Sequence, residues 1–175
     1  MALIKTLLGH TPTFGKGCYL AETATVIGDV ILGEECSVWF NAVIRGDVNS
    51  IRIGNRVNIQ DGAMIHCTYQ KTRTVIGNNV SIGHHAIVHG CTLQDDVLVG
   101  MGAIIMDNCV IGSNSIIAAG AVLLEGTVVE PGSIYAGVPA KKIKSVSEGL
   151  VKGEINRIAA NYVLYASWYN EAPSV

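Results

Sequence analysis

The sequence contains three histidines, His66, His84 and His89, that together could bind one metal ion. A neutral imidazole binds zinc at about 2.0–2.1 Å, and catalytic zinc sites with three protein ligands leave one position open for water. A water bound there ionises near neutral pH and becomes a nucleophile. This chemistry requires the three rings to meet, so the elements that carry them decide whether the site can form.

An aliphatic residue recurs about every six positions from Ile27 to Leu123, which is the period of neither an α-helix nor an alternating strand. Glycine and other turn-forming residues commonly follow it, as suits a tight corner after a short strand. Three hexads then make one triangular coil. The repeat aligns in three columns that contain only Leu, Ile and Val: Leu32, Ile53, Ile76, Leu93 and Ile111; Val38, Ile59, Ile82, Val99 and Ile117; Ile44, Ile65, Val88, Ile105 and Leu123.

This pattern resembles the hexapeptide-repeat left-handed parallel β-helices over residues 10–140, so we expect an all-β solenoid. Pro131 and Pro139 mark the exit from the coils. Beyond them, apolar residues at helical spacing predict an amphipathic C-terminal α-helix that packs along the coil: Ile155, Ile158, Ala159, Tyr162, Val163 and Ala166. Residues 1–145 should form the β-helix and residues 146–175 the helical segment.

The columns also place the histidines, because residues at equal offsets in successive coils stack about 4.8 Å apart. His66 and His89 follow the third column and share one vertical line with Arg45. His84 lies on another line, with Asp61 in the coil before it. In a threefold-symmetric trimer of triangular prisms, the line with His84 on one subunit can meet the line with His66 and His89 on its neighbour. We therefore predict a homotrimer whose subunits share a three-histidine metal site.

Two other histidines and one insertion are not assigned to this site. His85 should point the other way along an extended strand, and His10 lies outside the repeats. Residues 67–73 interrupt the repeat and predict a protruding loop.

The composition argues against several classes of protein. Twelve basic and fourteen acidic residues give a net charge of −2, and no run of like charges suggests a nucleic acid or membrane partner. The apolar stretch within residues 1–8 is too short for a signal peptide, which predicts a cytoplasmic location. Five cysteines without a CxxC pair suggest neither a disulfide framework nor a thiolate zinc site.

Five short motifs follow one another in a characteristic order: Ile44-Arg45-Gly46-Asp47, Asn58-Ile59-Gln60-Asp61-Gly62, Ile65-His66, Ile82-Gly83-His84 and Val88-His89-Gly90. In this order they resemble the signature of the γ-class carbonic anhydrases, and especially of their shorter homologues, which are also described as hexapeptide-repeat acetyltransferases. The resemblance implies that His66 and His89 bind the metal from one subunit and His84 from the next. It also implies an ion pair between subunits that joins Arg45 to Asp61, in agreement with the column positions.

The same resemblance implies roles for three further residues. Gln60 would hold the metal-bound water or bicarbonate, and Asn58 would be a neighbouring polar group. Tyr162, in the predicted helix, would correspond to a tyrosine that approaches the site. The metal would be zinc, although three imidazoles also accept iron, cobalt or nickel.

The activity implied is hydration of carbon dioxide to bicarbonate, which requires a proton to leave the site in each turnover. Fast members of the family use carboxylates near the metal for this step. Here Val48 follows Asp47, and the loop after His66 offers Tyr69 and Lys71 but no acid. We therefore expect low or absent hydration activity.

Three other functions remain open, because a fold alone does not decide function. Gly137-Val138-Pro139-Ala140-Lys141 resembles the terminal motif of coenzyme A dependent hexapeptide acyltransferases. A zinc thioesterase would use the same metal-bound water on another substrate, and a non-catalytic assembly protein would use none. Tight coenzyme A binding without metal would indicate the transferase, and metal analysis with a hydration assay would separate the rest.

Overall fold

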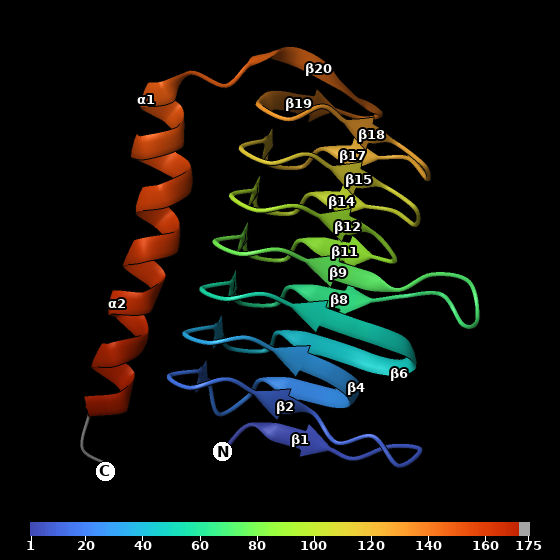
Figure 1. Cartoon of the computed structure of the whole chain (residues 1–175), viewed down its shortest axis with the longest axis vertical. Helices are drawn as coiled ribbons and strands as arrows, with labels where there is room; N and C mark the ends of the chain where they lie inside the picture. Colours follow the sequence, from blue (N-terminus) through green and yellow to red (C-terminus); the bar gives the residue numbers. More distant parts are fainter. Residues whose placement is uncertain (172–175) are drawn as a thin grey trace.

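The computed structural model describes residues 1–171, whose short strands stack coil upon coil beside one long helix (Figure 1). Strands at equivalent positions of successive coils pair in parallel; the antiparallel pair β19–β20 ends the stack. The architecture confirms the predicted left-handed β-helix of hexapeptide repeats with a C-terminal helix.

Three flat faces are built from these strands. The first face contains β3 (Tyr19–Leu20), β5 (Ser37–Val38), β7 (Asn58–Ile59), β10 (Ser81–Ile82), β13 (Leu98–Val99), β16 (Ile116–Ile117), β19 (Ser133–Gly137) and β20 (Ala140–Ser145). The second contains β8 (Met64–His66), β11 (Ile87–His89), β14 (Ile104–Ile105) and β17 (Val122–Leu123). The third contains β9 (Thr74–Ile76), β12 (Thr92–Leu93), β15 (Val110–Ile111) and β18 (Val128–Val129).

Two strands are longer than the short strands that the repeat predicts. β4 (Thr25–Leu32) and β6 (Val43–Ile53) each continue from the second face onto the third, and β1 (Leu3–Lys5) and β2 (Thr13–Phe14) pair with β4. The register between β4 and β6 shifts after Gly28, because residues 47–50 lengthen this corner without breaking the extended backbone.

All three predicted aliphatic columns are in register. Leu32 pairs with Ile53, Val38 with Ile59, and Ile44 with Ile65, and each column continues through the later coils. Ile59, Ile82 and Ile117 are among the fully buried side chains of the core. Burying one such side chain contributes roughly 1.5–3 kcal/mol, so the columns supply the main stabilisation of the coils.

The corners explain the turn-forming residues between hexads. A Cβ atom on Gly54 would lie 2.7 Å from the carbonyl oxygen of Gly77 in the next coil, so the stacking distance excludes a side chain there. Asn79 and Asn108 adopt left-handed φ angles of 54° and 60°, which asparagine tolerates better than most residues. His85 also adopts this conformation, with φ 57°. Its predicted place in an extended strand is therefore wrong: it is an exposed corner residue whose ring lies against Gly62.

The C-terminal helix begins at Glu148, ahead of the apolar residues that predicted it. Its segments run without a break through α1 (Glu148–Leu150), the π-helical η1 (Val151–Asn156) and α2 (Arg157–Glu171). The Ser147 hydroxyl caps it by accepting a hydrogen bond from the Leu150 N–H. Residues 172–175 of the predicted helical segment lie outside the described residues. Among residues 1–171, no helix is both long enough and apolar enough to span a bilayer.

The helix covers one end of the first face, where α2 contacts β3, β5 and β7. Of the residues predicted to face the coil, Ile155, Ala159 and Ala166 are buried. Tyr162 packs edge-on against Trp39, with ring centroids 5.3 Å apart. The predicted loop is also present: residues 67–73 project away from the stack between β8 and β9 (Figure 1).

Candidate metal centre

His66 and His89 form a stacked pair on the second face. They are register partners on β8 and β11, and their ring centroids are 5.1 Å apart. Nδ1 of His66 lies 3.1 Å from Nε2 of His89. Two nitrogens that share a tetrahedral zinc ion at about 2.0–2.1 Å are roughly 3.3 Å apart. The pair therefore fits two ligands of one metal ion.

A carboxylate holds the other nitrogen of each ring. Nε2 of His66 is 3.0 Å from Oδ1 of Asp47, and Nδ1 of His89 is 2.6 Å from Oδ1 of Asp107. Carboxylates that accept the second N–H of a metal-binding histidine fix its tautomer and ring orientation. Each ring thus directs toward its partner the nitrogen that a metal would need.

Sequence reasoning gave neither Asp47 nor Asp107 a role. Asp47 stood in the Arg45-Gly46-Asp47 motif, and its spacing of two residues from Arg45 was a usable signal. Asp107 comes from the coil after His89 and follows Met106, which continues the His66 and His89 line. Its contact depends on the corner conformation, which the column pattern does not specify.

Burial favours the neutral state of His66, and hydrogen bonds favour the ionised state of the carboxylates beside the pair. Burial is the largest cause that lowers the pKa of His66, so its ring is neutral at neutral pH. Burial opposes ionisation of Asp47, but hydrogen bonds from Arg45 and His66 lower the pKa of its carboxyl group. For Asp107, burial is likewise outweighed by hydrogen bonds from Thr68 and His89, which lower its pKa.

His84 lies on a separate corner, as its column position predicts. Its Nδ1 is 2.9 Å from Oδ2 of Asp61, and about two fifths of each side chain is exposed. Like the other two histidines, it has one nitrogen held by a carboxylate, which leaves Nε2 for a metal. Within residues 1–171 of a single chain, no three His, Cys, Asp or Glu side chains converge as a metal site.

The predicted ion pair between Arg45 and Asp61 does not form within one chain. Arg45 instead bonds to Asp47, and Asp61 bonds to His84. The predicted pair concerns two subunits, so a contact between them remains a prediction.

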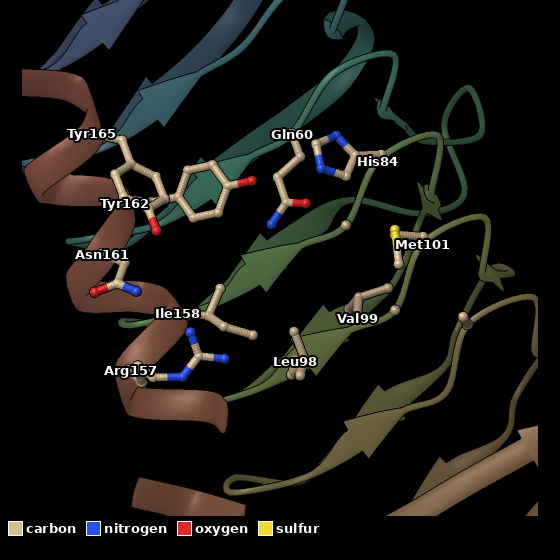
Figure 2. A pocket seen from close by; sticks show the side chains of 13 residues that line it. Gln60, His84, Leu98, Val99, Met101, Arg157, Ile158, Asn161, Tyr162 and Tyr165 are labelled. Atoms are coloured by element: carbon tan, nitrogen blue, oxygen red, sulfur yellow. The ribbon is translucent and has the colours of Figure 1, made fainter. Parts of the chain in front are cut away.

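A pocket of about 380 Å³ lies beside His84, between the coil and the helix (Figure 2). Gln60 and Met101 line it from the coil, and Arg157 and Tyr162 line it from the helix. The three residues given catalytic roles by resemblance are therefore near this corner, since Asn58 contacts Gln60.

Gln60 is held in one orientation. Its Nε2 donates to Oδ1 of Asn58 at 3.0 Å, and Nδ2 of Asn58 donates to Oγ of Ser81 at 2.8 Å. Gln60, Asn58 and Ser81 are all buried. The chain of bonds leaves Oε1 of Gln60 as a positioned acceptor. Burial raises the pKa of Tyr162 to about 12, so its hydroxyl group remains a donor at neutral pH.

Comparison with known proteins identifies the family of this chain. Residues 90–125 match the model of the bacterial transferase hexapeptide family (six repeats). The "Probable carbonic anhydrase" of Methanocaldococcus jannaschii is 52% identical over 148 residues, which cover 85% of this chain and 92% of that protein. The chain belongs to the γ-class carbonic anhydrase family.

Two further relatives show how far the family resemblance extends. "Gamma carbonic anhydrase 2, mitochondrial" of Arabidopsis thaliana is 37% identical over 91% of this chain, which spans only 59% of that relative. A crystal structure of a hexapeptide transferase family protein from Anaplasma phagocytophilum superimposes with a TM-score of 0.91 at 37% identity. The match covers 95% of this chain and 98% of that chain, so this γ-class anhydrase homologue shares its whole fold with a protein described as a transferase.

Proposed function

We propose that this γ-class anhydrase homologue is a homotrimer whose subunits share three metal sites, each made of His66 and His89 from one chain and His84 from its neighbour. With a zinc-class ion held by these residues, the assembly would hydrate carbon dioxide to bicarbonate. The observation that carries the proposal is the pairing of His66 Nδ1 with His89 Nε2, while Asp47 and Asp107 hold the opposite nitrogens. A cytoplasmic location also remains a prediction, and the Arabidopsis relative is named as mitochondrial.

The face that carries the histidine pair supports a subunit interface. Its outward side chains form an apolar line in register: Val43, Met64, Ile87, Ile104 and Val122. Met106 and Leu124 lie two residues after Ile104 and Val122 in the chain and continue the line of His66 and His89. They are 41% and 52% exposed. Exposed apolar surface with polar groups at its rim is typical of protein–protein contacts. A second copy that covers this face could bring its His84 to the pair, and threefold symmetry would close the assembly.

The chain's own residues would prepare the site for hydration. A bound zinc ion would supply a water that ionises near neutral pH. Oε1 of Gln60 would accept a hydrogen bond from a ligand beside His84, and the fixed Asn58 contact would keep it there. The Tyr162 hydroxyl group, kept protonated by burial, would donate.

Transfer of the proton from the site to solvent is expected to be the slow step of hydration. Asp107 has both carboxylate oxygens engaged, by His89, Thr68 and Thr72. Val48, next to Asp47, packs partly buried against the core and offers no proton acceptor. General acid–base groups contribute typically 10²- to 10⁴-fold to a rate. We therefore expect slow hydration even with the metal in place.

The experiment is metal analysis followed by stopped-flow hydration. Protein purified without added metal, or reloaded with zinc or cobalt, should contain about one metal ion per subunit. Its hydration rate should lie at least roughly 100-fold below that of an efficient anhydrase measured in parallel. Protein that takes up neither metal would refute the proposed site. A rate equal to that of the efficient enzyme would refute the argument from Val48 and Asp107.

One observation favours a second candidate, hydrolysis of an acyl thioester by the same metal-bound water. The pocket beside His84 is far larger than carbon dioxide needs and lies in the range of pockets for larger organic ligands, about 300–1,000 Å³. Leu98 and Ile158 give it apolar walls, and Arg157 offers a cation. This candidate would be supported if the protein cleaved short-chain acyl thioesters only with metal bound, and if Leu98→Trp suppressed that cleavage. Equal rates with and without metal would exclude it.

A further inference from the structure

Asp107 links a metal-binding histidine to the projecting loop between β8 and β9. Its Oδ1 lies 2.6 Å from Nδ1 of His89 and 3.3 Å from Oγ1 of Thr72. The Thr68 hydroxyl group donates to its Oδ2, and the Thr68 N–H donates to Oγ1 of Thr72 at 3.0 Å. One carboxylate therefore joins the imidazole to both ends of the loop.

The backbone beside His89 leaves room for this carboxylate. A Cβ atom on Gly90 would lie 2.0 Å from Oδ1 of Asp107 and 2.2 Å from Oγ1 of Thr72. Gly90 also has a φ of 53°, which disfavours a side chain for a second reason. The place of Asp107 thus depends on glycine at the position that follows the histidine.

The loop is exposed at its tip and anchored at its ends. Its outer residues Tyr69, Gln70 and Lys71 are exposed, whereas Thr72 is only 5% exposed. The two threonines that contact Asp107 therefore hold the loop against the coil. A change in the position of Asp107 would therefore alter its contacts with both the loop and the ring of His89.

We propose that Asp107 is a positioning residue of the metal centre, which acts with Thr68 and Thr72 to hold His89 in the tautomer that presents Nε2. The inference rests on the proposed function, since it assumes that His89 binds metal. Ordering of the loop is then coupled to metal binding, because both depend on the same carboxylate. Outer carboxylates of this kind typically change metal affinity by about 10- to 100-fold.

The test compares Asp107→Asn with Asp96→Asn. Asp96 is an aspartate at another corner, where it accepts a hydrogen bond from the Asn79 amide rather than from a histidine. Zinc affinity, measured by competition with a chelator, should fall about 10- to 100-fold for Asp107→Asn and stay unchanged for Asp96→Asn. The visible spectrum of the cobalt-loaded protein should shift only in Asp107→Asn, which a purely structural role would not cause.

Thr68 keeps the inference testable if Asp107→Asn does not fold. Thr68→Val should weaken zinc binding and speed amide hydrogen exchange in residues 67–73 of the metal-loaded protein, and Thr68→Ser should restore both. Wild-type affinity and spectra in Asp107→Asn, or in Thr68→Val, would overturn the positioning role while the metal site stands. A wild-type protein that binds no zinc or cobalt would instead overturn the proposed function, and this inference with it.

Discussion

His84→Ala is expected to abolish metal retention as completely as His66→Ala, although the two residues lie on different corners of the chain. Each site would lose one of three ligands, and positioning carboxylates alone already account for about 10- to 100-fold in affinity. We therefore expect zinc affinity to fall by more than roughly 100-fold in each variant. Metal analysis after dialysis against a weak chelator measures this directly.

His85→Ala provides the matched control for this prediction. His85 is adjacent to His84 in sequence, but it is an exposed corner residue. Its removal should leave metal content unchanged. If His84→Ala retained the metal while His66→Ala lost it, the third ligand would have to come from elsewhere.

Arg45→Ala and Asp61→Ala are expected to weaken the proposed trimer strongly. Column position places Arg45 on the line of His66 and Asp61 on the line of His84, so the proposed interface brings the two charges together. Removal of one partner of a buried ion pair costs about 3–5 kcal/mol, which corresponds to roughly 100- to 4,000-fold in the dissociation constant. Sedimentation of metal-free protein over a dilution series measures the effect without any contribution from a shared metal.

Arg52→Ala is the control for this pair of variants. Arg52 follows the corner that β4 and β6 share, on the third face, and forms an ion pair with Asp29 at 2.8 Å. Partly exposed pairs of this kind contribute about 0–1 kcal/mol, so its trimer should dissociate like the wild type. Trimers of Arg45→Ala and Asp61→Ala that persist at the lowest concentrations would rule out the proposed contact.

The coils and the stacked histidine pair could be predicted from the sequence because both follow from one period. A hexad repeat with only Leu, Ile and Val inside determines which residues stack, and counting along it is enough to place His89 above His66. The same count puts His84 and Asp61 on a separate line, where they pair.

Features that depend on corner geometry were not predictable in this way. The repeat does not specify the backbone conformation at a corner. It therefore predicted neither the extended corners of β4 and β6 nor the left-handed backbone at His85. Asp107 reaches His89 across such a corner, and its contact requires the missing side chain of Gly90. Helical spacing located the apolar face of the last element, whereas the Ser147 cap at its start was not predicted.

The proposed site between subunits is tested most directly by mixing two variants that each lack one metal ligand. If His66 and His89 come from one subunit and His84 from the next, any trimer that contains both His66→Ala and His84→Ala chains has one complete junction. Co-refolded mixed trimers should therefore recover about one third of the wild-type metal content, while each variant alone recovers almost none. Mixed trimers confirmed by mass that bind no more metal than the separate variants would show that the three histidines do not form a site between subunits.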